Sequence, residues 1–118
     1  MPRVTEFHPI VPTRDVKASL EFFQNILGFE NPWTVDEKSV AVYEGISLDG
    51  HEIHFTPGTP NAESSAYLEL DDVNAYHAEV ERRGGDPSPL VDQFYGMRDF
   101  MITDPGDATV GFASALAG

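Results

Sequence analysis

Apolar residues recur along this chain with helical spacing in two stretches and with alternating spacing in most of the others. The first helical stretch begins at Asp15 and ends before Gly28, which predicts an amphipathic helix with Asp15 as its N-cap. The second follows Asp72 and is closed by Gly84-Gly85. The apolar residues that define the two helices are Val16, Leu20, Phe23 and Leu27, and then Val73, Tyr76 and Val80.

The other apolar stretches predict eight strands, four on each side of a polar segment. The expected strands cover residues 4–11, 33–36, 39–44, 51–56, 65–71, 88–92, 97–103 and 108–114. Asp49-Gly50 predicts a hairpin turn in the first half, and residues 104–107 (DPGD) predict a turn in the second. The segment PGTPNAESS at 57–65 has the composition of a linker.

The two halves repeat each other at an offset of 57 residues. The matching pairs are Asp15-Val16 with Asp72-Val73, Ala18 with Ala75, Gly28 with Gly85, Tyr43 with Phe100, Ile53 with Val110, and Phe55 with Phe112. A two-copy repeat predicts two βαβββ units that share one core, since each is too small to fold alone. We therefore expect an α+β fold in a single domain of residues 1–118, with units at 1–56 and 65–118 and a linker at 57–64.

Composition limits the classes of partner. Seven Lys and Arg against 20 Asp and Glu give a net charge of −13, which argues against nucleic acid. The absence of cysteine removes disulfides, thiolate metal sites and a cysteine nucleophile. No apolar run approaches membrane-spanning length and no signal peptide is evident at the N-terminus, so we expect no membrane partner and a cytoplasmic location.

Two motifs carry a family resemblance. The first is HPIVPTRDV at 8–16 with SLEFF at 19–23 and LGF at 27–29, and the second is YGMRDF at 95–100 with DPG at 104–106. With the βαβββ pattern, they make the chain similar to the glyoxalase/bleomycin resistance protein/dioxygenase superfamily, or vicinal oxygen chelate fold. The resemblance implies a curved mixed sheet with a concave ligand trough. It selects no single activity, because members include isomerases, dioxygenases, thiol transferases and drug-sequestering binders.

The resemblance also implies where a metal would bind. In metal-dependent members four side chains form the site, and the corresponding positions here are His8, His54, Ser65 and Gly111. Only the first two are strong ligands, whereas a catalytic divalent site needs about three. We therefore expect no catalytic residues, no metal and no cofactor. A metal site remains open as an alternative if Glu52 or Glu69 completes a set with the two histidines.

Strand alternation predicts which residues line the trough. Phe7, Pro9, Ile53 and Phe55 should point to the helix-covered side, and their neighbours to the concave face. The concave set is His8, Ile10, Glu52, His54, Thr56, Tyr67, Glu69, Met101, Thr109 and Ala113, with Trp33, Tyr43 and Tyr95 as candidates for the rim. An aromatic and acidic trough suits a flat, partly cationic ligand.

Two classes of function follow. The favoured one is a metal-free binding protein resembling bleomycin-type antibiotic resistance proteins, which would sequester a cationic or aromatic ligand and perform no chemistry. The alternative is a metal-dependent glyoxalase-like lyase or isomerase, or a dioxygenase, that uses His8 and His54. In either case we expect a homodimer, because no loop is long enough to cover the trough and superfamily members commonly close it with a second chain.

Overall fold

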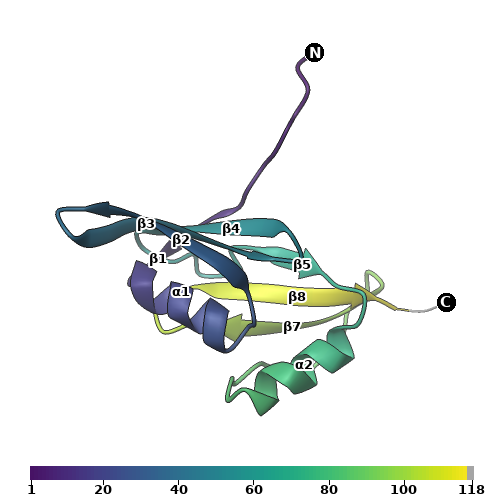
Figure 1. Cartoon of the computed structure of the whole chain (residues 1–118). Helices are drawn as coiled ribbons and strands as arrows, with labels where there is room; N and C mark the ends of the chain where they lie inside the picture. The colour runs from purple at the N-terminus through teal and green to yellow at the C-terminus, as the bar shows by residue number, and fades with distance from the viewer. Residues whose placement is uncertain (117–118) are drawn as a thin grey trace.

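Two βαβββ units follow one another along the chain (Figure 1). The computed structural model describes residues 1–116, apart from the side chain of Ala41; residues 117 and 118, which belong to the expected second unit, lie outside the described residues. The first unit comprises β1 (Ile10–Thr13), α1 (Val16–Asn25), β2 (Glu30–Glu37), β3 (Val40–Leu48) and β4 (His51–Pro57). The second comprises β5 (Tyr67–Glu69), α2 (Val73–Arg82), β6 (Val91–Asp92), β7 (Met97–Thr103) and β8 (Thr109–Ala115). The predicted α+β repeat is confirmed.

Each unit builds its own four-stranded mixed sheet. The strand orders are β1-β4-β3-β2 and β5-β8-β7-β6, so the two sheets have the same topology. In each, the first and last strands of the unit pair in parallel, and the other neighbours are antiparallel. The helix of each unit packs on its own sheet and leaves the opposite face of that sheet without a helix.

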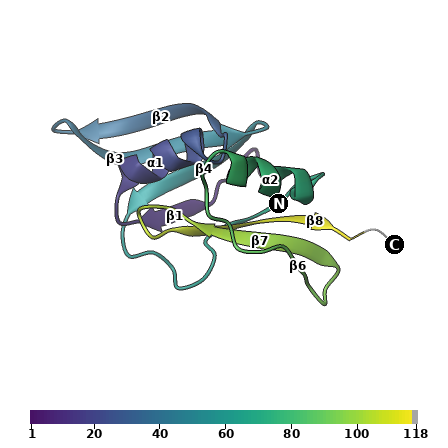
Figure 2. The same cartoon turned by 90° about the horizontal axis from the view of Figure 1, so that it is seen from below.

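Both helices begin as the sequence predicts. The Asp15 side chain accepts a hydrogen bond from Ala18 N, and Asp72 does the same for Ala75 N, each at 3.0 Å. The two helices lie end to end in Figure 2, and the Tyr76 hydroxyl of α2 donates to Leu27 O, just beyond α1, at 2.6 Å. This hydrogen bond links the two units.

One hydrophobic core extends through both units. Five buried phenylalanines form its centre, and their rings meet edge to face or stacked at 4.9–6.5 Å between centroids. The contact between Phe29 of the first unit and Phe112 of the second crosses the boundary. The five are Phe23, Phe29, Phe55, Phe100 and Phe112.

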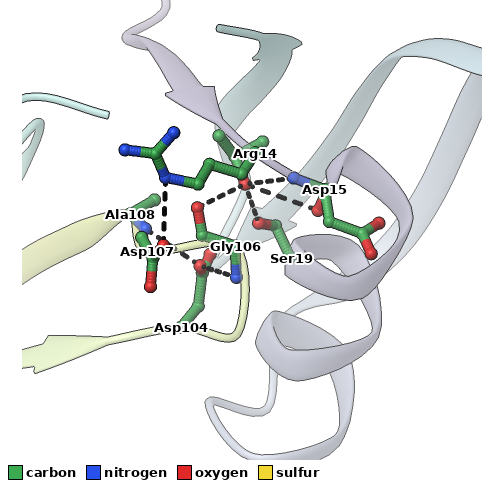
Figure 3. A network of polar contacts seen from close by, with 8 residues as sticks. Arg14, Asp15, Ser19, Asp104, Gly106, Asp107 and Ala108 are labelled. Carbon is green, nitrogen blue, oxygen red and sulfur yellow. Dashed lines mark hydrogen bonds and ion pairs between the residues drawn. The ribbon is translucent and has the colours of Figure 1, made fainter. Parts of the chain in front are cut away.

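A polar junction provides a second link between the units (Figure 3). Arg14 N donates to Gly106 O at 2.9 Å, and the Arg14 guanidinium pairs with Asp107 at 3.0 Å. The buried Thr13 hydroxyl lies 2.7 Å from Ser19 Oγ and donates to Gly106 O at 3.3 Å. The turn of residues 104–107 thus does more than reverse the chain, because it holds the second unit against the start of α1.

The turn itself is organised by a buried carboxyl group. Asp104 Oδ1 accepts from the backbone N–H groups of Gly106 and Ala108, at 2.8 and 3.1 Å. Burial raises the pKa of Asp104, although these hydrogen bonds act in the opposite direction. The Asp104 side chain is therefore part of the folded turn, and its buried surroundings influence whether it is charged.

The register of the sheets corrects one of the predicted equivalences. Ile10 pairs with His54 and Tyr67 with Gly111, which confirms the offset of 57 residues for the parallel strands. On β3, however, Glu44 lies opposite Phe55, whereas on β7 Phe100 lies opposite Phe112. Glu44, not Tyr43, is therefore the counterpart of Phe100. The cause is the chain between the paired residues: Phe112 follows Phe100 by 12 positions (112 − 100), whereas Phe55 follows Glu44 by 11 (55 − 44).

The N-terminal segment is the second correction. Pairing with β4 begins where His54 N donates to Pro9 O, so the strand does not start at residue 4 as expected. Residues 1–9 carry no regular secondary structure, and the exposed residues 1–7 extend away from the rest of the chain (Figure 1). Phe7 is 84 % exposed, and the prediction that it points to the helix-covered side is wrong. Ile53 and Phe55 are buried there, as expected.

Candidate functional site

The helix-free face of the first sheet gathers two histidines and a carboxylate. Glu52 and His54 lie two residues apart on β4, so both point to this face, and His8 reaches it from the segment before β1. Donor atoms of the three residues all lie within 4.8 Å of one another, and all three residues are partly buried. By sequence either Glu52 or Glu69 could accompany the histidines, and the structure groups Glu52 with them.

His54 is held through both of its ring nitrogens. Nε2 lies 2.8 Å from Glu52 Oε1, and Nδ1 lies 2.8 Å from the Tyr43 hydroxyl. Because a carboxylate can only accept, the neutral imidazole donates from Nε2 and accepts from Tyr43 at Nδ1. The hydrogen bond to His54 lowers the pKa of Glu52, so that side chain is ionised at neutral pH.

Aromatic rings complete the surroundings of His54. The His8 ring stacks on it with centroids 4.4 Å apart, and the Trp33 ring meets it edge-on at 4.9 Å. Gly45 makes room for the indole, since a Cβ atom there would lie 2.3 Å from Trp33. The His8 Nδ1 atom is buried and has no hydrogen-bond partner among residues 1–116. His8 therefore brings a buried, unpaired ring nitrogen to the group.

The second sheet has the equivalent positions but a different chemistry. The shared register makes Gly111 the counterpart of His54, and Ser65 lies 57 residues after His8. A Cβ atom on Gly111 would lie 2.7 Å from Met101 Sδ and 2.9 Å from the Tyr67 ring. These two side chains therefore occupy the space that the histidine side chain takes in the first unit.

A buried carboxylate lies beside them. Asp99 on β7 is 2 % exposed, although it faces the helix-free side of the sheet. Its Oδ2 accepts from the hydroxyls of Tyr67 and Tyr95, at 2.8 and 3.1 Å, and its Oδ1 accepts from the Gln93 side chain at 3.0 Å. Burial, followed by the hydrogen bond to Asp99, raises the pKa of Tyr67, which therefore stays a neutral donor.

Comparisons with known proteins show which family this architecture belongs to. The model of the glyoxalase/bleomycin resistance protein/dioxygenase superfamily matches residues 6–112. The chain belongs to this superfamily. A search of curated proteins finds no match to it.

Solved structures of the superfamily fold are similar over almost the whole chain. A glyoxalase-related enzyme from Clostridium phytofermentans has a TM-score of 0.85 at 21 % identity, with 98 % of each chain covered. The bleomycin-binding protein of Streptomyces verticillus, complexed with copper(II)-bleomycin, has a TM-score of 0.78 at 24 % identity, covering 100 % of this chain and 99 % of that one. An antibiotic binding protein from Streptomyces sp. CB03234 has a TM-score of 0.77 at 19 % identity, with 98 % of each covered. Identities this low show the shared fold alone.

The predicted site residues fall into two groups, one on each sheet. The first sheet brings together His8, Glu52 and His54, with Tyr43 and Trp33 beside them. Ile10 pairs with His54 in the register and is exposed. The second sheet brings together Tyr67, Tyr95 and Met101, while Glu69 is exposed on β5. Among the concave-face candidates, Ala113 is fully buried.

Sequence reasoning missed Asp99 as a site residue. Two signals could have found it. Asp99 precedes Met101 by two positions on one predicted strand, so the two share a face, and two tyrosines were already expected near that face. In the sequence, Asp99 was interpreted only as part of the family motif YGMRDF.

No helix among residues 1–116 is long and apolar enough to cross a membrane.

Proposed function

We propose that this superfamily member is a metal-free small-molecule binding protein that resembles bleomycin-type antibiotic resistance proteins. It would sequester a cationic or aromatic ligand in a trough shared by two copies of the chain. The supporting observation is the second sheet, where Gly111 stands in place of His54 and Met101 and Tyr67 fill the space beside it. A metal site that draws on both units would lack half of its donors.

The surfaces on the two sheets favour a flat ligand with positive charge. Trp33 and Tyr43 lie on the first, and Tyr67 and Tyr95 on the second, so an aromatic ligand would find stacking partners on both. Carboxylates are available on both sheets as well. Side chains of this kind bind cations by charge and by cation–π contact. These aromatic side chains and carboxylates can bind a ligand without reacting with it.

The charge of the chain supports the same choice of ligand. A net charge of −13 attracts cations over a distance, which raises the rate of encounter, whereas affinity depends on the few groups that touch the ligand. Rising salt should therefore slow association. A substitution at a contacting residue should instead speed dissociation.

A thermal-shift screen tests the proposal. Cationic antibiotics, including bleomycin-type glycopeptides, would be compared with neutral and anionic metabolites of similar size. Stabilisation by cationic aromatic compounds, at a stoichiometry of one ligand per site and without turnover, is the expected result. If only neutral or anionic compounds stabilise the protein, the acidic composition serves solubility and the ligand class is wrong.

A second function has one specific observation in its favour. His8, Glu52 and His54 supply three donors of the type that holds Fe, Mn, Ni or Zn, and they converge within 4.8 Å in a single unit. A divalent ion bound there would polarise a substrate oxygen, as a glyoxalase-like lyase or isomerase or a dioxygenase requires. The His54 bond to Glu52 would have to open for both to bind the ion.

The alternative predicts different behaviour on mutation. Under it, His8→Ala and His54→Ala would each abolish a metal-dependent activity and lower metal content. Under the binding function, neither variant changes metal content. His51→Ala, which removes an exposed histidine from the same strand, is the matched control.

A further inference from the structure

Asp99 has the environment of a buried anion that lacks a counter-ion. All three of its hydrogen bonds come from neutral donors, namely two phenols and an amide. An ionised carboxylate can accept all three hydrogen bonds at once. A protonated carboxyl group would instead point its own O–H toward groups that already donate to it. The hydrogen bonds therefore fit the ionised form.

No cationic side chain among residues 1–116 forms an ion pair with Asp99. The neighbouring Arg98 bonds to Asp92 and Asn74 instead, at 2.6–3.3 Å. A buried charge without a partner is costly, since the transfer from water is compensated only by hydrogen bonds. This cost needs an explanation, because the neighbouring cation, Arg98, points to the opposite face of β7 and cannot offset it.

We propose that Asp99 is the anionic base of an organic-cation subsite, in which the cation lies on the rings of Tyr67 and Tyr95. This inference rests on the proposed binding function and deepens it, because it locates the positive group of the ligand on the second sheet. The hydroxyls of both tyrosines point to one oxygen of Asp99, and both rings are about half exposed. The cation would contact the rings and lie within the field of the carboxylate at their hydroxyl ends.

The arrangement strengthens cation binding in two ways. A phenol that donates to a carboxylate carries more negative charge on its ring, which increases the attraction of the ring face for a cation. The carboxylate is also shielded from water, so its field reaches the ring surface with little screening. Phe94 extends the aromatic surface, since it is 100 % exposed and its ring lies 5.2 Å from that of Tyr95.

Glu69 is a weaker candidate for the same role. It shares this face of the sheet, because Glu69 pairs with Ala113 and Ala113 pairs with Asp99. Its side chain is exposed, however, so water and salt screen its charge. Glu69 is a ligand-binding candidate by sequence, but the buried Asp99 is the stronger candidate for the cation.

The test compares two probes of nearly the same shape. Benzamidine is a planar aromatic cation at neutral pH, and benzamide is its neutral counterpart. Binding of each would be measured by NMR titration, with the Gln93 amide and the tyrosine rings as reporters. Benzamidine should bind at least about tenfold more tightly than benzamide, and should shift those reporters first.

Asp99→Asn should remove most of this difference, by weakening benzamidine about tenfold and leaving benzamide unchanged. Asp49→Asn is the matched control, because it makes the same change in net charge in an exposed turn with a positive φ of 50°, which asparagine tolerates. Equal binding of the two probes to the wild type would overturn the proposal, and so would an unchanged benzamidine affinity in folded Asp99→Asn.

Two further outcomes separate the subsite from the binding function. If Asp99→Asn does not fold, the wild-type comparison and the reporters decide the question by themselves. If an antibiotic from the screen binds tightly but neither moves these reporters nor responds to Asp99→Asn, the subsite is wrong and the proposed function stands. If benzamidine binds as expected and no larger ligand does, the subsite stands and the sequestering function fails.

Discussion

The cores of the two units differ at Glu44, which stands in the place where the second unit has Phe100. Its side chain is 1 % exposed, and its Oε2 atom has no hydrogen-bond partner among residues 1–116. Burial raises the pKa of Glu44 to about 7, and the negative charges of Asp36, Asp15 and Glu21 act in the same direction, against Lys17. The first unit therefore holds a carboxyl group that is half protonated near neutral pH.

A raised pKa in the folded state links stability to pH. The folded protein binds a proton that the unfolded chain releases above the ordinary pKa of 4.5, so the contribution of Glu44 is fully favourable below that pH. It is lost as pH rises through about 7, at a rate of up to ~1.4 kcal/mol per pH unit. This direction is opposite to that of an ion-paired carboxylate.

Glu44→Gln should remove this pH dependence. Denaturant unfolding of wild type and variant between pH 4 and 8 would give the difference in free energy of unfolding. We expect that difference to move in favour of the variant as pH rises, by ~3 kcal/mol in total. Glu37→Gln, at an exposed position of β2, is the control and should show a constant difference. A constant difference for Glu44→Gln as well would contradict the assignment.

At the scale of elements, the β7–β8 turn determines how the second unit meets the first. A Cβ atom on Gly106 would lie 1.9 Å from Thr13 Oγ1 and 3.2 Å from the backbone N of Asp15. The turn can approach β1 and α1 this closely only because residue 106 has no side chain. The junction in Figure 3 depends on that approach.

Gly106→Ala should therefore weaken the link between the units. The added methyl group forces the turn away from Thr13, which breaks the junction hydrogen bonds and costs about 1–3 kcal/mol or more. Thermal unfolding would show this as a lower Tm. Gly58→Ala is the matched control, since its Cβ would lie 3.4 Å from Pro12, an ordinary contact. Equal Tm values for the two variants would argue against the junction.

The sequence predicted the elements better than their contacts. The N-caps Asp15 and Asp72 and the Asp49-Gly50 hairpin follow from local chemistry and are confirmed, whereas α1 ends at Asn25, earlier than expected. The relative register of β3 and β7 was missed, because it depends on the length of a turn and not on residue similarity. Tyr43 and Phe100 look alike in sequence but point to opposite faces.

The site, like the fold, was only partly predictable from the sequence. The alternation of side chains between the two faces of β4 was enough to place Glu52 and His54 together, because it holds for any strand. It could not show that Met101 and Tyr67 fill the space at Gly111, or that Asp99 is buried beneath two tyrosines. Those facts depend on side chains from different strands, which no local pattern relates.

At the scale of the whole molecule, exposed apolar side chains are consistent with the proposed homodimer. Phe7 lies in a segment that extends away from its own chain, and Phe94 and Ile10 are exposed at other places. Large apolar groups left in water are typical of surfaces that another chain covers. The helix-free faces of the two sheets are available for such a contact.

Light scattering at micromolar concentration should give a mass near twice 13.0 kDa. Phe7→Ser should shift the mass toward that of one chain, because this side chain makes no core contact within its own chain. Val40→Ser, another exposed apolar position, is the control and should leave the mass unchanged. A wild-type mass near 13.0 kDa would rule out the homodimer under these conditions.

Metal content is the most direct test of the central claim, that the site binds ligand without a metal. The protein would be purified without a histidine tag, dialysed and analysed for Zn, Mn, Ni and Fe. Because Ser65 and Gly111 replace two of the four donors, we expect well under one equivalent of any metal and no change of Tm on addition of chelator. One equivalent of metal that survives dialysis, and is lost in His8→Ala and His54→Ala, would contradict the account.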